Sequence, residues 1–176
     1  MPSISKTGHR FRETFVTEAG IPFLGTLFPA DEGDVPSYDF STPRLFLRVG
    51  PDCPARTRSI LVDQHDRYFL LADHDLTNHY RTHRLFQLTH EVPWSRVTTV
   101  KDALTGLARR TGESNLGPLR CLIEMYGRET PDPGMKVKEE VRRVITGAEI
   151  QLGDKIDGMI VKRLDPVLGV FLAEIQ

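Results

Sequence analysis

The sequence predicts a mainly β protein, with a small antiparallel β-barrel or sandwich core, a second strand-rich C-terminal lobe and one or two short helices. Apolar residues alternate with polar ones in residues 44–49, 59–73 and 141–175, a period typical of half-buried strands. Clusters of Gly, Pro, Asp and Ser separate these runs, as expected for turns between strands. Helical spacing occurs in only two short segments, which limits helix to a minor share.

Bulk composition is that of a globular protein. The chain has 176 residues, of which 39% are hydrophobic and 27% charged, so it can form one domain or two small lobes. Its net charge of −1 argues against a general nucleic-acid binder, although a local basic face remains open. No apolar run approaches the about 20 residues of a membrane span. The first residues lack the apolar core of a signal peptide, so we expect synthesis in the cytoplasm without an anchor.

The N-terminal part is expected to form an arm or short helix over residues 1–20. Phe11, Phe15 and Ala19 are four apart, which places them on one helical face within residues 8–19, and Gly20 follows as a stop. A strand is predicted for residues 21–28.

A β-barrel core is expected in residues 21–92. Strands are predicted at 44–49, 59–64, 67–73 and 80–92. Only His65 and Asp66 separate the second and third of these, which indicates a tight hairpin. Residues 29–43 contain four acidic residues and three prolines and are predicted to form a long surface loop.

Residues 93–118 are expected to form a helical connector. The apolar spacing in residues 98–110 is helical, and Thr99 with Asp102 matches a helix-capping pattern. The apolar positions are Val100, Ala103, Leu104, Leu107 and Ala108.

The C-terminal β lobe is expected in residues 119–176. Strands at 119–127, 141–147, 148–165 and 168–175 are predicted, the last three as a compact antiparallel meander. Gly153-Asp154 and Asp157-Gly158 are turn-forming pairs. The two halves resemble one another weakly, with Tyr68–Leu71 corresponding to Met159–Val161. Chance similarity between two meanders is the alternative.

The hairpin region of residues 63–83 is rich in His and Asp, the types that ligate metals or transfer protons. His79 and His83, however, would lie about 13 Å apart on a strand, too far to share one zinc ion. We therefore expect no bound metal and no cofactor. The aspartates are interpreted as turn residues at strand ends: Asp63, Asp66, Asp73, Asp75, Asp154, Asp157 and Asp165.

Catalytic motifs are absent from the sequence: there is no nucleophile elbow, phosphate-binding glycine loop or zinc-protease motif. The two cysteines are expected to be reduced thiols, Cys121 in a core and Cys53 exposed. These observations favour a structural or binding protein over an enzyme. The alternative is a small hydrolase or metal-binding barrel that uses the His/Asp-rich hairpin.

Candidate interface residues combine arginines with aromatic side chains. Basic residues cluster after residue 80 and alternate with the aromatic residues Tyr80, Phe86 and Trp94. This composition is found in contact surfaces, with a solvated face as the alternative. Trp94 is the best single candidate, and a core position is its alternative. Tyr38 and Phe40 lie in the acidic loop, where solvent-facing aromatic side chains are costly unless a partner covers them. The candidates are Tyr38, Phe40, Arg81, Arg84, Trp94 and Arg96.

Residues 21–89 resemble the small β-barrel core of tailed-phage head–tail joining proteins, also called head-closure proteins. The pattern is GTLF at 25–28, the acidic loop, PRLFLRV at 43–49, a polar link, SILVDQHDRYFLLADHD at 59–75 and HRLFQLT at 83–89. In that family a strand leads to a flexible loop, a strand of the type P-x-L-F-x-R, a hairpin and a closing strand. The chain departs from it in its hairpin turn and in the whole of residues 90–176.

The resemblance implies a virion protein that is made in the host cytoplasm and placed at the head–tail junction. Such proteins form a homo-oligomeric ring beneath the portal, and DNA passes through the channel of the ring. The implied partners are other copies of the chain, a portal or adaptor protein, a tail or tail-terminator protein and the packaged DNA. Catalysis is not implied. Another capsid-associated or binding β-barrel is the alternative.

Overall fold

A computed structural model describes residues 12–29, 45–76, 79–101, 104–106, 108–129 and 138–176. The chain divides into two compact units, Met1–Leu88 and Thr89–Gln176. All of the regular structure in the described residues is β-strand. The mainly β fold class predicted from the sequence is confirmed, but the described residues of the two predicted helices are not helical.

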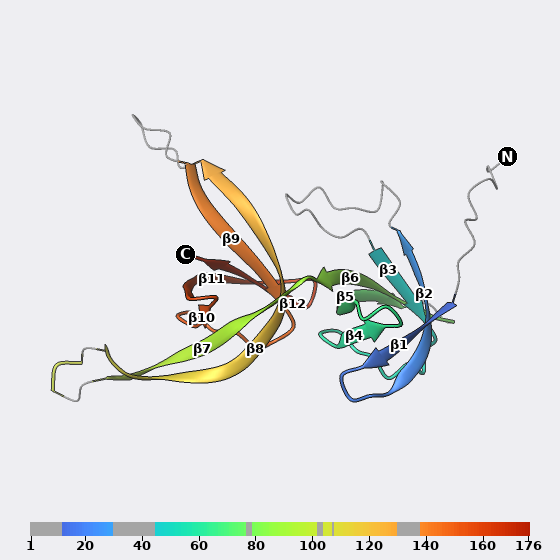
Figure 1. The fold of residues 1–176 in the computed structure, drawn as a ribbon, viewed down its shortest axis with the longest axis horizontal. Coiled ribbons are helices and arrows are strands. Elements are labelled where there is room, and N and C mark those ends of the chain that lie inside the picture. Colours follow the sequence, from blue (N-terminus) through green and yellow to red (C-terminus); the bar gives the residue numbers. More distant parts are fainter. Residues whose placement is uncertain (1–11, 30–44, 77–78, 102–103, 107, 130–137) are drawn as a thin grey trace. The chain divides into compact units, whose positions relative to one another are not determined.

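The first unit contains a closed antiparallel barrel of six strands (Figure 1). The strands are β1 (Arg12–Thr17), β2 (Pro22–Pro29), β3 (Leu45–Val49), β4 (Ile60–Asp63), β5 (Tyr68–Leu76) and β6 (Arg81–Leu88). Their order around the barrel is β1-β2-β3-β6-β5-β4, and β4 pairs with β1 to close it. Closure gives every strand two neighbours, so the sheet has no edge strand.

The second unit contains a second closed barrel of six strands. These are β7 (His90–Lys101), β8 (Ala108–Glu129), β9 (Lys138–Thr146), β10 (Lys155–Ile156), β11 (Met159–Val167) and β12 (Val170–Ile175). Their order is β7-β8-β9-β12-β11-β10, closed by pairing of β10 with β7. The predicted meander is wrong in one respect, because β9 pairs with β12 and β8 but not with β10.

The two barrels have the same strand order. If β1 to β6 are matched in chain order with β7 to β12, the order of the strands around the first barrel is the same as that around the second. The likeness predicted between Tyr68–Leu71 and Met159–Val161 matches this, since these segments begin β5 and β11. The correspondence covers all six strands of each unit, which chance similarity between two three-stranded meanders does not explain.

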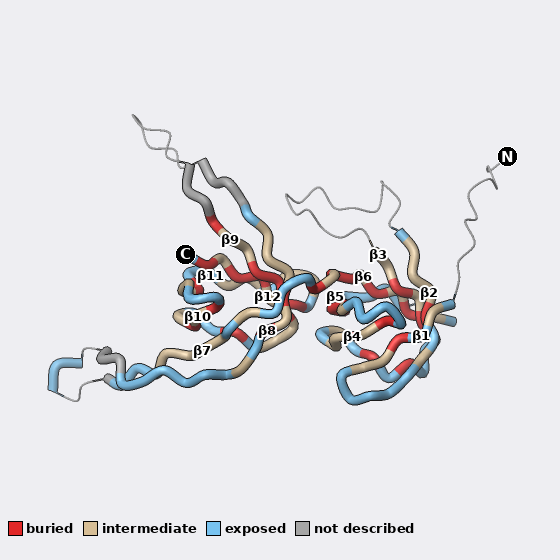
Figure 2. Tube along the Cα trace, in the orientation of Figure 1, coloured by how far each residue is buried: buried red, intermediate tan, exposed pale blue. Residues whose placement is uncertain are grey.

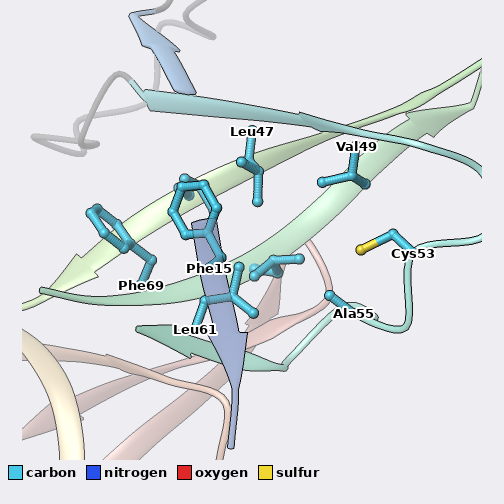
Figure 3. Close-up of a cluster of buried hydrophobic side chains, with 9 residues drawn as sticks. Phe15, Leu47, Val49, Cys53, Ala55, Leu61 and Phe69 are labelled. Atoms are coloured by element: carbon cyan, nitrogen blue, oxygen red, sulfur yellow. The ribbon is translucent and has the colours of Figure 1, made fainter. Parts of the chain in front are cut away.

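Each barrel has its own apolar core. In the first, the ring of Phe15 from β1 lies 5.9 Å from that of Phe23 and 6.3 Å from that of Phe69, measured between ring centres. Figure 3 shows Phe15 beside Phe69. Leu47 and Leu61 lie in the same buried cluster. In the second, the buried residues come from five strands and the segment before β10: Leu119, Cys121, Val144, Ile150, Ile156, Val161, Ala173 and Ile175.

The helix predicted for residues 8–19 is wrong within the described part, because residues 12–17 form β1. β1 carries aromatic and β-branched residues, which suit a strand. Its pairing with β2 and β4 completes the barrel, so tertiary contacts outweigh the helical spacing. Gly20 lies in the hairpin turn that follows β1. Its φ is 77°, and its N–H donates to the Thr17 carbonyl oxygen at 2.8 Å.

The helical connector predicted for residues 93–118 is also wrong. β7 and β8 pair from His90–Cys121 out to Lys101–Ala108, so this segment is a long hairpin of the second barrel. Thr99, the expected helix cap, lies opposite Arg110 in the ladder. The second unit therefore begins at Thr89 instead of residue 119, and the first unit includes β1.

Turns and cysteines complete the comparison with sequence. The β4–β5 hairpin is confirmed, but its loop has three residues, 64–66, instead of His65 and Asp66 alone, because the Asp63 N–H donates to the Arg67 carbonyl. The Asp157-Gly158 turn is confirmed, with φ of 52° and 78°, as a two-residue turn requires. Cys121 is fully buried, as predicted, whereas Cys53, expected to be exposed, is buried among Val49 and its core neighbours (Figure 3).

Candidate protein-interaction surfaces

The outer face of the first barrel carries arginine and aromatic side chains on neighbouring strands. Phe28 on β2 lies opposite Phe46 on β3, and Phe46 lies opposite Arg84 on β6. Directly opposite residues project from the same face of a sheet, and Arg48 with Thr82 forms the next row of that face. Together with Tyr80 these residues form what we call the arginine–aromatic patch: Phe28, Phe46, Arg48, Tyr80, Thr82 and Arg84.

Arg48 lies at the centre of the arginine–aromatic patch. Its guanidinium carbon is 4.2 Å from the ring centre of Tyr80 and 5.2 Å from that of Phe28, both within cation–π range. Phe28 in turn stacks on Phe46, with ring centres 5.6 Å apart. The Nε atom of Arg48 is buried and has no hydrogen-bond partner.

A shallow hollow of about 300 Å³ lies over the arginine–aromatic patch. Asp75 on β5 also lines it, opposite Thr82. The lining of the hollow therefore carries both signs of charge: the carboxylate of Asp75 and the guanidinium groups of Arg48 and Arg84. Arginines held by aromatic rings beside an apolar floor are typical of the centres of protein–protein interfaces. The arrangement can bind a partner.

Two residues of the arginine–aromatic patch, Tyr80 and Arg84, were noted in the sequence, whereas Phe28, Phe46 and Arg48 were missed. The available signal was the alternation in residues 44–49, which turns Leu47 inward and Phe46 and Arg48 outward. An outward-facing aromatic residue on a strand indicates a possible binding surface. Which residues lie beside it depends on the register of the neighbouring strands, which the sequence does not give.

Arg81, an interface candidate, lies in the interior of the first unit. It is 6% exposed, and its guanidinium donates to the carbonyl oxygens of Cys53 and Ala55, the latter at 3.2 Å. The Arg56 guanidinium donates to the same two carbonyls, at 2.7 and 3.2 Å. Arg81 therefore fixes the connection between β3 and β4, which also explains the burial of Cys53.

Trp94 and Arg96, two further candidates, lie together at one turn of the second barrel. The indole packs against the core, and its Nε1 donates to Asp154 at 3.1 Å. Arg96 donates to both carboxylate oxygens of Asp154 at 2.9 Å, and the Gln151 N–H donates to one of them. Burial raises the pKa of Asp154, but these bonds outweigh it and hold the pKa below its usual value. Both side chains thus anchor the turn before β10.

The His/Asp-rich hairpin is organised by structural bonds. Asp63, which is 5% exposed, accepts the N–H groups of His65 and Arg67 at 2.8 and 2.9 Å. It also pairs with the Arg67 guanidinium at 2.6 Å. Burial raises the pKa of Asp63, but these bonds lower it overall. Asp66 has φ of 57°, a turn conformation. Asp165, expected at a turn, instead lies within β11 opposite Leu172.

His74 and His83 face each other across β5 and β6. Their ring centres are 4.8 Å apart, beside a β-bulge between Leu71 and His74. His83 is fully buried, its Nδ1 lies 3.3 Å from the Ala72 carbonyl oxygen and its Nε2 has no partner. Burial lowers the pKa of His83 to about 4, so the ring is neutral at pH 7.

Neither a group of metal-ligating side chains nor a membrane-spanning helix is found in the part of the chain that the structure describes. No three His, Cys, Asp or Glu side chains in these residues lie close enough together to hold a metal ion. Within the same residues, no helix is long and apolar enough to cross a membrane.

The β7–β8 hairpin is a second candidate surface. β7 pairs with β10 only at Trp94 and Ser95, and β8 pairs with β9 only from Leu122 onward. Between these points and the turn, the two strands extend from the barrel as a largely exposed ribbon (Figure 2). We call the described residues between 96 and 116 the β7–β8 ribbon. Val100 on β7 is 53% exposed.

Tyr38 and Phe40, with most of the predicted loop of residues 29–43, lie outside the described residues. Of the remaining candidates, the structure places Arg84 in the arginine–aromatic patch and Trp94, Arg96 and Arg81 in structural networks. Comparison of the chain with protein-family models, curated proteins and solved structures finds no match.

Proposed function

We propose that the chain is a structural protein of the tailed-phage head–tail junction, where copies form a ring that connects the portal vertex to the tail and encloses the DNA path. The observation that carries this proposal is the closed six-stranded barrel of residues 12–88. It covers the segment that resembles head–tail joining proteins, for which a small β-barrel is expected. A role in assembly requires binding surfaces and no catalytic centre.

The arginine–aromatic patch supports the proposal as the protein-binding surface of that barrel. Arg48 is held between two aromatic rings, so little side-chain freedom is lost when a partner binds. The guanidinium charge of Arg48, which lines the hollow, favours a partner that supplies an acceptor, such as a carboxylate or a backbone carbonyl. In a ring, this partner is a neighbouring copy or an adjacent junction protein.

The test combines electron microscopy with binding to capsids. The purified protein should form rings by itself or on tail-less capsids that display a portal. Arg48→Ala should abolish ring formation or binding, because it removes the central cation of the arginine–aromatic patch. Arg12→Ala, which removes an exposed arginine of β1, is the matched control and should leave assembly unchanged. A wild-type protein that neither forms rings nor binds such capsids would overturn the proposal.

Residues 30–40 provide an independent test of the same proposal. β2 and β3 pair as far as Pro29–Leu45, so a short Gly/Ser linker can replace residues 30–40 outside the paired positions. The resemblance assigns this segment to partner or channel contacts. The variant should keep its thermal transition and fail to join capsids to tails. Full assembly competence would reject the role of this segment, and loss of folding would indicate that Tyr38 and Phe40 serve the core.

A further inference from the structure

Arg48 and Arg84 carry positive charges that no carboxylate neutralises within the described residues. Both side chains are half-buried and line the hollow over the arginine–aromatic patch, yet neither forms an ion pair with a described residue, Asp75 included. Arg142 and Arg163 of the second barrel, by contrast, each pair with a carboxylate. Guanidinium groups bind carboxylates through charge-assisted hydrogen bonds. The two arginines of the patch therefore form a site for carboxylates that come from elsewhere.

The two arginines are close enough for one short segment to reach both. Arg84 lies opposite Phe46, and Arg48 lies in the next row of the same outer face, opposite Thr82. Residues in this diagonal relation have Cα atoms about 7–8 Å apart. This distance is roughly the span of two residues of extended chain. The hollow of about 300 Å³ suits a few side chains of such a segment.

Residues 30–40 have the complementary composition. They contain four carboxylates, two aromatic side chains and no Lys or Arg. Some of the carboxylates are two or three residues apart, which matches the spacing of the two guanidinium groups. The aromatic side chains can cover the partly exposed rings of the patch and remove apolar surface from water. The residues are Asp31, Glu32, Asp34, Tyr38, Asp39 and Phe40.

We propose that residues 30–40 of one copy bind the arginine–aromatic patch of a second copy. Two of their carboxylates pair with Arg48 and Arg84, and an aromatic side chain fills the hollow. β2 and β3 are paired as far as Pro29–Leu45, and residues 30–44 between them are long enough to reach about 25 Å from the barrel.

This inference rests on the proposed function, because it names the contact between neighbouring copies. One copy supplies the segment and the next supplies the patch. A head-to-tail contact of this kind can close into a ring, whereas a contact between two identical surfaces ends at a dimer.

The lining of the hollow favours a peptide segment over a nucleic acid. Asp75 lies among the lining residues, and its carboxylate repels a continuous chain of phosphates. A peptide can place its carboxylates at the two arginines and uncharged residues beside Asp75. Residues 35–37, Val-Pro-Ser, supply an uncharged stretch of this kind.

Two full-length variants separate the segment from the patch. Asp31→Asn/Glu32→Gln/Asp34→Asn/Asp39→Asn removes the charges of the segment and keeps the patch, whereas Arg48→Gln/Arg84→Gln does the reverse. Sedimentation velocity of the wild-type chain should show concentration-dependent association. Each variant alone should associate at least about tenfold more weakly. An equimolar mixture should regain association as a 1:1 pair that grows no further, because one charged segment and one charged patch remain in the pair.

A peptide makes the test independent of how well the variants fold. A synthetic peptide of residues 30–40 should dissociate the wild-type assembly, and the same peptide with the four substitutions should not. The matched control is Arg163→Gln, which removes an exposed arginine of the second barrel and should leave association unchanged. Added salt should weaken the association, as expected for opposite charges.

Three results would overturn the inference. The first is a wild-type chain that stays monomeric at every soluble concentration. The second is a mixture that associates no more than its components, which is also the result expected if the segment binds the patch of its own chain. The third is binding of an oligonucleotide that is lost in Arg48→Gln/Arg84→Gln while the peptide has no effect, which would assign the patch to nucleic acid.

Failure of this contact and failure of the junction role give different results. Association that follows the variants as expected, in a protein that forms no rings and binds no capsids, would support the contact and contradict the junction role. Rings or capsid binding that persist in both variants would support the junction role and contradict the contact.

Discussion

Asp154 is a buried carboxylate on which the turn before β10 depends. It is 1% exposed and accepts hydrogen bonds from Trp94, Arg96 and Gln151. Asp154→Asn removes the charge but keeps the shape, so it should lower the free energy of unfolding by about 2 kcal/mol. Trp94 is the single tryptophan, so its fluorescence during urea denaturation reports the change.

The matched control for that variant is Asp165→Asn. Asp165 pairs with Arg163, whose side chain is 58% exposed, and exposed ion pairs contribute little. Its unfolding free energy should change by less than about 0.5 kcal/mol. An equal loss in both variants would show that the network around Asp154 does not stabilise the second barrel.

His83 should make the stability of the first barrel depend on pH. Its folded pKa is about 4, below the 6.5 of the free side chain, so between these values the unfolded chain binds a proton that the folded chain does not. Stability should therefore fall as the pH drops from 6.5 to 4, by about 3 kcal/mol at most. Denaturation followed by circular dichroism at several pH values measures this.

Replacing the histidine separates this effect from other titrations. His83→Gln should flatten the pH dependence between 6.5 and 4, while His65→Gln, at the exposed β4–β5 turn, should not. Asp63 and Asp154 have lowered pKa values, so the stability they contribute is lost at lower pH, as the pH falls below 3.8. An unchanged pH profile in His83→Gln would exclude His83 as the cause.

At the level of elements, Gly25 controls how closely β2 approaches the core. A Cβ atom there would lie 2.6 Å from Leu47 Cδ1 and 3.3 Å from the Phe15 ring. Gly25→Ala should therefore destabilise the first barrel by about 1–3 kcal/mol through overpacking. Gly50→Ala is the control, because a Cβ at Gly50 meets no atom within 4 Å. Thermal melts of the two variants should differ, and equal melting temperatures would contradict the close contact.

Elements set by local chemistry could be predicted from the sequence, and those set by distant pairing could not. The β10–β11 hairpin depends on the two-residue turn Asp157-Gly158, with positive φ at both residues, and the β4–β5 hairpin on a three-residue loop in which Asp66 has positive φ. β1 carried helical spacing, and only its pairing with β2 and β4 makes it a strand. The apolar residues of 98–110 fitted a helix equally well, because a short apolar pattern does not record which strand will lie beside it.

The candidate surface shows the same limit. Tyr80 and Arg84 were visible in the sequence because they are close together in it. The arginine–aromatic patch also needs Phe28 and Arg48, which reach it through the register of β2, β3 and β6. Trp94 and Arg96 were chosen by residue type, but their bonds to Asp154, 60 and 58 residues away, decide their role.

For the whole molecule, we expect each unit to fold when expressed alone. Residues 1–88 and 89–176 each contain a closed barrel and a separate buried cluster. Each fragment should give a β-type circular dichroism spectrum and a cooperative thermal transition, and its amide NMR spectrum should overlay the corresponding part of the full-length spectrum. A fragment that remains unfolded would show that its barrel needs the other half of the chain.

The shared strand order has a consequence for how the chain can be modified. In the first barrel four residues, 18–21, join β1 to β2, whereas the equivalent connection in the second barrel is extended into the β7–β8 ribbon. The same barrel architecture thus accommodates either a tight turn or a long hairpin extension at the connection between its first and second strands. That connection is a natural insertion site, at which a peptide epitope or a small reporter domain can be added to the first barrel without disturbing the residues that pack inside it.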